Sequence, residues 1–120
     1  QKMAERYLTE LADLPIILPP QVKNKKTDLH SWHLFCCQIV SKNVNRDQFI
    51  QKMSEAGIGT SVHFIPLHTQ PYWKDHYSLT NDQFPHASNY YQNAVSLPLY
   101  TKMSDEEQTR VIAVIRQILA

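Results

Sequence analysis

Residues 32–40 read WHLFCCQIV and form the strongest predicted strand of the chain. The stretch is rich in aromatic and branched side chains, which favour extended backbone. Successive side chains of a strand point to opposite faces. One face would carry Trp32, Leu34, Cys36, Gln38 and Val40, and the other His33, Phe35, Cys37 and Ile39. Because both faces are mostly apolar, we expect this strand to be central in a sheet or covered on both sides.

The segment before this strand combines a helical pattern with an extended one. Residues 2–14 carry apolar side chains at helical spacing, and Pro15 is expected to end that helix. Residues 16–20 are apolar and end in two prolines, which suits an extended segment at the edge of a sheet. Residues 21–30 are expected to form a polar loop.

The segment after the strand predicts a capped helix. Asn45 is the expected N-cap, and Gln48 stands where it can complete a capping box. The buried stripe of this helix would be Phe49, Ile50 and Met53. Gly57 suits the left-handed position after the last helical turn. Residues 59–65 then have the pattern of a second strand.

The remainder of the chain completes a small α+β pattern. Residues 66–83 are expected to be a loop with a short helix, residues 84–91 a helix and residues 95–99 an extended piece. Ser104 and Glu107 form the capping box of a final helix. Its expected core face is Val111, Ile112, Ile115, Ile118 and Leu119. This order predicts an α+β domain, with helices packed on a small sheet of about three mostly antiparallel strands.

The composition excludes several classes of protein. The chain has 120 residues, enough for one domain, and a compact domain of that size has a radius of gyration of about 14 Å. It contains two glycines, where average usage would give roughly eight, so the Gly-rich loops of dinucleotide and P-loop sites are excluded. A formal charge of +1 offers no electrostatic footprint for nucleic acid. No apolar run is long enough for a transmembrane helix, so we expect neither a nucleic-acid nor a membrane partner.

The two cysteines are adjacent, at Cys36 and Cys37. Neighbouring strand residues point to opposite faces, so a disulfide between these two would be strained. Unpaired thiols fit core packing in a reducing compartment. A redox or metal-binding pair is the alternative interpretation.

Histidine is the over-represented reactive residue, with six copies in 120 positions. No spacing among them matches a zinc pattern, and we expect no metal site. His63, near the end of the predicted second strand, either faces a ligand pocket or is a hydrogen-bonded core histidine. His33 lies in an apolar strand, where a satisfied core histidine is the simpler interpretation. The uncharged aromatic loop at residues 66–73 has the composition of a contact surface or a substrate-facing loop.

Five blocks in order carry a resemblance to a known family. They are HSWHLF at 30–35, NRDQF at 45–49, AGIGTSVHF at 56–64, PLHTQPY at 66–72 and SLPLY at 96–100. With these blocks the chain resembles the C-terminal part of the DegT/DnrJ/EryC1/StrS sugar aminotransferases. The resemblance extends over nearly the whole chain, and the ordered set is more specific than any single block.

The resemblance implies a fold type I enzyme that depends on pyridoxal 5′-phosphate (PLP). Such enzymes transfer an amino group, usually from glutamate, to a keto-sugar attached to a nucleotide, and they serve bacterial polysaccharide or amino-sugar biosynthesis. The family's Schiff-base lysine and phosphate-binding groups lie on a large N-terminal domain. Residues 1–120 would then be a single small C-terminal domain, with residues 1–14 part of the helix that connects the two domains.

It follows that this chain alone should be inactive and bind no cofactor. Its catalytic and cofactor-binding residues would lie on the missing N-terminal domain, and the full-length enzyme is expected to be a cytoplasmic homodimer that binds a nucleotide-sugar. By position in the family's blocks, the expected substrate-binding residues are His63, Phe64, His68, Tyr72, Trp32 and His33. The sequence departs from the commoner family pattern at Trp32, often Tyr, and at Cys36 and Cys37, often aliphatic. The alternative is a stand-alone ligand-binding or protein-interaction module that reuses this domain.

Overall fold

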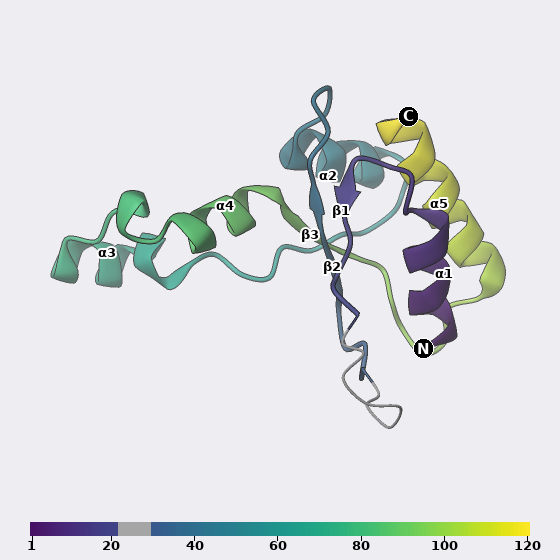
Figure 1. Ribbon diagram of the computed structural model, residues 1–120, viewed down its shortest axis with the longest axis horizontal. Coiled ribbons are helices and arrows are strands. Elements are labelled where there is room, and N and C mark those ends of the chain that lie inside the picture. The colour runs from purple at the N-terminus through teal and green to yellow at the C-terminus, as the bar shows by residue number, and fades with distance from the viewer. Residues whose placement is uncertain (22–29) are drawn as a thin grey trace.

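The centre of the molecule is a three-stranded antiparallel sheet with the order β1-β2-β3 (Figure 1). The computed structural model describes residues 1–21 and 30–120. The strands are β1 (Ile16–Ile17), β2 (Phe35–Ile39) and β3 (Ala94–Leu97). The predicted α+β class and antiparallel sheet are therefore confirmed, and the apolar segment after Pro15 supplies the expected edge strand.

Strand β2 is the central strand, as its two apolar faces predicted. Phe35 pairs with Leu97 on one side, and Ile39 pairs with Ile16 on the other. Phe35, Cys37 and Ile39 are buried in the core, while Cys36 and Gln38 on the opposite face are half-buried. The strand begins at Phe35 and not at Trp32, because Trp32 has a φ of 48° and turns the backbone out of the strand direction.

Three helices cover the buried face of the sheet: α1 (Lys2–Glu10), α2 (Arg46–Glu55) and α5 (Asp105–Leu119). Figure 1 shows α1 and α5 side by side. The side chain of Gln108 on α5 donates to the Met3 carbonyl of α1 at 2.7 Å. Tyr7, fully buried, packs on Phe35 with ring centres 5.0 Å apart. None of the helices in the described ranges is both long and apolar enough to cross a membrane.

Helix α1 is shorter than residues 2–14. It ends at Glu10 with Leu11 as its C-cap, so the expectation that Pro15 ends it was wrong by one turn. The chain must turn before Pro15 because Val40 donates to the Pro15 carbonyl at 3.0 Å and Ile16 pairs with Ile39. Of the polar loop expected at residues 21–30, residues 22–29 lie outside the described residues.

The predicted helix boundaries at the two capping boxes are confirmed. The Asn45 side chain accepts from the Gln48 amide at 2.9 Å, and the Gln48 side chain accepts from the Asn45 amide at 3.0 Å. Ser104 and Glu107 make the same reciprocal pair at the start of α5. Gly57 follows α2 with a φ of 71°, the left-handed conformation expected of it.

The expectation of a second strand over residues 59–65 was wrong. Only an isolated bridge forms there, between Ser61 and Ser96. In that antiparallel register Gly59 would lie opposite Pro98, which has no N–H to donate, and Phe64 would lie opposite Asn93, the last residue of a helix. The backbone opposite residues 59–65 therefore provides strand partners only close to Ser61, and the pairing stops after one bridge.

Residues 62–93 instead form an arm that extends away from the sheet (Figure 1). It contains the 3₁₀ turns η1 (Leu67–Thr69) and η2 (Asn81–Gln83) and the helices α3 (Pro71–Tyr77) and α4 (Pro85–Asn93). The short helix and the helix opened by Pro85 were both predicted. The arm explains why the radius of gyration is 16.0 Å and not the value of about 14 Å expected for a compact domain.

Candidate functional site

His63 lies against the half-buried face of the sheet, next to a serine and a cysteine. Its Nδ1 is 2.8 Å from Ser96 Oγ, and the same oxygen is 3.1 Å from Cys36 Sγ. The three side chains come from the segment after the Ser61 bridge, from β3 and from β2. We call this group the His63–Ser96–Cys36 cluster.

The strand register explains why these side chains meet. Ser96 pairs with Cys36 on one side and with Ser61 on the other. Directly paired residues of antiparallel neighbours point to the same face, and His63 is two residues beyond Ser61. Ser96 is 5% exposed and is the polar residue of a strand whose four positions are all buried. Its hydroxyl therefore needs the partners that His63 and Cys36 provide.

Tyr90 of α4 and the thiol of Cys36 lie on the same face of the sheet. Both residues line a cavity of about 250 Å³, together with Trp32. Partial burial raises the pKa of Tyr90, and the nearby Cys36 raises it further.

Cys37 points the other way, into the core. Burial raises the pKa of its thiol to about 12, and both cysteines are free. The interpretation of the pair as unbridged thiols on opposite faces is confirmed. In the part of the chain that the structure describes, no three His, Cys, Asp or Glu side chains come together as a metal site.

Trp32 and His33 lie at the start of β2. Trp32 is half-buried and stacks on Phe35 with ring centres 5.8 Å apart, whereas His33 is exposed. Both line a cavity of about 690 Å³, whose other walls are the first residues of α1 and the segment from Leu99 to Thr101. His33 is therefore not the buried core histidine that its apolar strand suggested.

His68 is enclosed within the arm. It is 5% exposed, and its Nε2 lies 3.2 Å from Asn81 Oδ1 and 3.1 Å from Ser88 Oγ. Its ring stacks on Phe84 with centres 4.6 Å apart. In this structure the imidazole joins η1, η2 and α4, so contact with a substrate would require that network to open.

Phe64 and Tyr72 are exposed on the arm. Phe64 is 76% exposed, and Tyr72, 65% exposed, stacks on His76 of the same helix. They belong to a larger exposed aromatic and apolar surface of the arm. Its members are Phe64, Ile65, Leu67, Tyr72, Trp73, Tyr77, Phe84 and Tyr90.

The structure does not bring the six residues expected at the site together in one place. His63 joins the cluster on the sheet, and Trp32 reaches the same face through the cavity it shares with Cys36. His68 in η1 and Tyr72 in α3 belong to the arm, as does the exposed Phe64. Ser96 was not among the residues expected at the site. The sequence does contain a signal for it, because Ser96 carries the one hydroxyl of the apolar segment 95–99, and a buried hydroxyl needs a hydrogen-bond partner.

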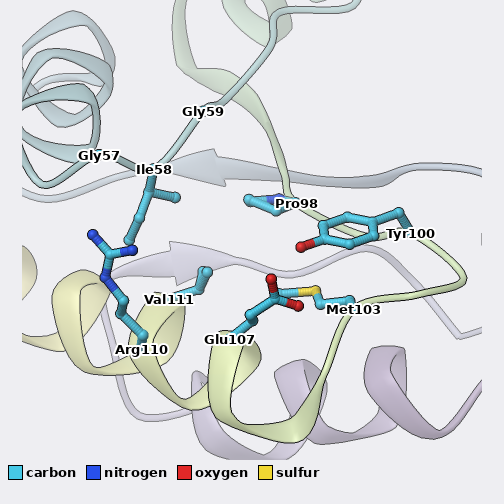
Figure 2. A pocket seen from close by; sticks show the side chains of 9 residues that line it. All are labelled: Gly57, Ile58, Gly59, Pro98, Tyr100, Met103, Glu107, Arg110 and Val111. Carbon is cyan, nitrogen blue, oxygen red and sulfur yellow. The ribbon is translucent and has the colours of Figure 1, made fainter.

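A separate cavity of about 430 Å³ lies between the Gly57–Gly59 segment and α5. Figure 2 shows Glu107 and Arg110 on α5 at this cavity, with Ile58 and Pro98 across from them. Both charged side chains are already engaged: Glu107 accepts from the Ser104 amide, and Arg110 donates to the Ala56 carbonyl. These bonds hold helix ends, so we assign no ligand to this cavity.

The fold is shared with solved aminotransferase structures. DesV of S. venezuelae, solved in complex with a ketimine intermediate, matches with a TM-score of 0.84 and 27% identity, over 98% of this chain and 30% of that one. Spr1654 of Streptococcus pneumoniae is described as a sugar aminotransferase and was solved in PMP and PLP forms. Those structures give TM-scores of 0.82 and 0.80 at 27% identity, over 98% and 99% of this chain and 29% and 31% of theirs. The architecture is therefore that of an aminotransferase domain.

The sequence then identifies the family. Residues 1–116 match the model of the DegT/DnrJ/EryC1/StrS aminotransferase family, and the chain belongs to that family. The spore coat polysaccharide biosynthesis protein SpsC of Bacillus subtilis (strain 168) is 38% identical over 122 residues, which cover 99% of this chain and 31% of SpsC. The chain thus spans about a third of the length of the curated relatives it matches. The resemblance noted in the five sequence blocks is confirmed.

Proposed function

We propose that this chain is the small C-terminal domain of a PLP-dependent aminotransferase that transfers an amino group from glutamate to a nucleotide-linked keto-sugar. The observation that carries the proposal is the family match over residues 1–116. The name of SpsC supports a role in polysaccharide biosynthesis. In this proposal residues 1–120 are one domain, and α1 is part of the connection to the N-terminal domain.

The described residues do not fit the cofactor by themselves. A Schiff-base lysine is activated by desolvation or by a neighbouring cation. Every lysine in the described ranges is exposed: Lys2, Lys42, Lys52, Lys74 and Lys102. We therefore assign the cofactor to the N-terminal domain, which is consistent with the PLP and PMP forms of Spr1654, and we expect the isolated chain to be inactive and cofactor-free.

The task of this chain would be to position the sugar. Holding a reactant in place removes part of the entropic barrier of the reaction. His63 would donate or accept one hydrogen bond to the substrate or cofactor and would not be the primary base. Its neighbour Phe64 offers an apolar face beside it. The remaining proposed contacts are Trp32, His33, His68 and Tyr72.

The exposed surface of the arm supports a larger assembly. Among the elements of the arm, α3, η2 and α4 contain no buried residue, and large exposed apolar patches commonly mark interfaces. We propose that another part of the longer protein or the second subunit of a homodimer covers this surface. The two free thiols support a reducing, cytoplasmic compartment.

The proposal is tested with the full-length protein and a panel of nucleotide-linked keto-sugars, using glutamate as the donor and measuring 2-oxoglutarate. We expect turnover with at least one sugar, and none with residues 1–120 alone. The absence of turnover across the panel in a folded, cofactor-loaded protein would refute the proposed reaction.

A stand-alone binding module is the second candidate, favoured by the same exposed aromatic surface. The aminotransferase domain and the stand-alone module predict different masses for the protein found in cells. Mass spectrometry of the endogenous protein should detect a chain about three times as long as this one. A protein of about 14.0 kDa would favour the module instead.

A further inference from the structure

Ser96 occupies a fixed place beside His63. Its amide donates to the Ser61 carbonyl at 2.7 Å, and its carbonyl accepts from the Ser61 amide at 3.3 Å. On its other side it stands opposite Cys36 in the ladder between β2 and β3. With neighbours on both edges and 5% exposure, the residue has little freedom to direct its hydroxyl elsewhere.

The hydroxyl of Ser96 has one proton for two neighbours. A serine hydroxyl donates once and accepts with its lone pairs. Either it donates to His63 Nδ1 and accepts from the Cys36 thiol, or it donates to the sulfur and accepts from a protonated Nδ1. Both contacts are within hydrogen-bond distance, at 2.8 Å to Nδ1 and 3.1 Å to Sγ. Imidazole nitrogen is a good acceptor and sulfur a weak one, which favours donation from Ser96 to Nδ1.

That direction fixes the tautomer of the imidazole. The proton of a neutral histidine sits on the nitrogen opposite the one that accepts a hydrogen bond. If Nδ1 accepts from Ser96, the proton is on Nε2. The bond to Ser96 is the one side-chain hydrogen bond of His63 among the described residues, so Nε2–H remains able to donate to an oxygen of a bound molecule.

We propose that Ser96 is a positioning residue, which holds neutral His63 in the Nε2–H form so that the ring donates to an oxygen of the sugar substrate. The substrate part of this inference rests on the proposed function, whereas the tautomer does not. Cys36 completes the arrangement by donating its thiol proton to Ser96 Oγ. A hydrogen-bond donor at His63 would suit a carbonyl or hydroxyl oxygen.

The tautomer is measured by NMR of the full-length protein labelled with ¹⁵N-histidine, at about pH 8.5, where ordinary histidines are neutral. We expect Nδ1 of His63 to be unprotonated and Nε2 protonated, and Ser96→Ala to give an average of the two forms. Ser96→Thr retains the hydroxyl and should give the wild-type His63 spectrum. Cys36→Ala should also give the wild-type His63 spectrum, because Ser96 still donates its proton to Nδ1.

Ser88→Ala is the matched control, because Ser88 contacts the ring of His68 at 3.1 Å in the arm. It should leave the His63 signals unchanged. A protonated Nδ1 in the wild-type protein overturns the proposal even if the Ser96 variants do not fold, and so does an unchanged spectrum in a folded Ser96→Ala variant.

Kinetics separate this proposal from the proposed function. Loss of the Ser96 bond should lower kcat/KM for the keto-sugar by roughly three- to tenfold, with recovery in Ser96→Thr. If no sugar is turned over, the proposed function fails, while the NMR result still decides the tautomer. If turnover is unaffected in Ser96→Ala, the positioning role is refuted and the proposed function stands.

Discussion

His63 and His68 are both hydrogen-bonded, but the two side chains differ in burial and in their hydrogen-bond partners. His63 is half-buried and its Nδ1 contacts Ser96, whereas His68 is 5% exposed and its Nε2 contacts two side chains of the arm. A half-buried residue with one bond contributes little to folding compared with an enclosed one. His63 is therefore the better candidate for contact with a substrate.

This difference predicts the effect of His63→Ala in the full-length enzyme. Under the proposed function, we expect kcat/KM for the keto-sugar to fall about tenfold, because one lost hydrogen bond of about 1.4 kcal/mol corresponds to a factor of ten. The Tm should change little. Steady-state kinetics and thermal unfolding of the same preparation measure both quantities. Unchanged kinetics with a collapsed Tm would make His63 a core histidine.

The buried thiol of Cys37 predicts a dependence of stability on pH. An unfolded cysteine ionises near pH 8.5, whereas burial raises the pKa of Cys37 to about 12 in the folded protein. Its contribution to stability is therefore complete below about pH 8.5 and is lost as the pH rises toward 12. Urea unfolding at pH 7 and pH 10 should show the decrease, and Cys37→Ala should show a smaller one.

Gly57 and Gly59 form a matched pair for a backbone test. Gly57 has a φ of 71°, and an added Cβ would lie 3.2 Å from Arg110 Nη2, whereas a Cβ on Gly59 meets nothing within 4 Å. We expect Gly57→Ala to lower the free energy of unfolding by about 1–2 kcal/mol and Gly59→Ala to leave it nearly unchanged. Equal effects in chemical denaturation would contradict the left-handed assignment.

At the scale of elements, the helix ends follow directly from local sequence. Ser104 satisfies the Glu107 amide at 3.1 Å, and three acidic residues occupy the first turn of α5. Ser104→Ala should therefore cost about 1 kcal/mol of stability. Gln1→Ala is the control, since Gln1 is the N-cap of α1 and makes no side-chain capping bond. Urea titrations of both variants measure the difference, and an equal loss would show that the capping box adds nothing.

Strand formation could not be predicted in the same way. Residues 59–65 have the composition of a strand, yet only Ser61 is paired, because Pro98 and α4 limit what lies opposite. A helix satisfies its backbone within its own segment, whereas a strand depends on a partner from elsewhere in the chain. The pattern at 32–40 succeeded because partners exist on both sides of it.

At the scale of the whole molecule, the arm exposes apolar side chains that we expect another surface to cover. All seven residues of α3 are exposed, including Tyr72, Trp73 and Tyr77. We expect hydrogen exchange at the α3 amides to be slower in the full-length protein than in residues 1–120, because coverage suppresses local opening. The amides of α5 serve as the internal reference. Equal exchange at α3 in both proteins would contradict coverage of the arm.

By itself the sequence determined the α+β class, the capped helices, the central strand and the family, since caps and apolar periodicity act over a few residues. It also singled out His63 as a residue of interest. Only the tertiary structure decided that His63 meets Ser96 and Cys36, that His68 is enclosed, and that residues 62–93 leave the sheet. The first outcome depends on strand register, which is set by the pairing of whole strands and brings together residues 33 positions apart. The enclosure of His68 depends on contacts with residues 13 and 20 positions further along the chain, a separation over which apolar periodicity gives no signal.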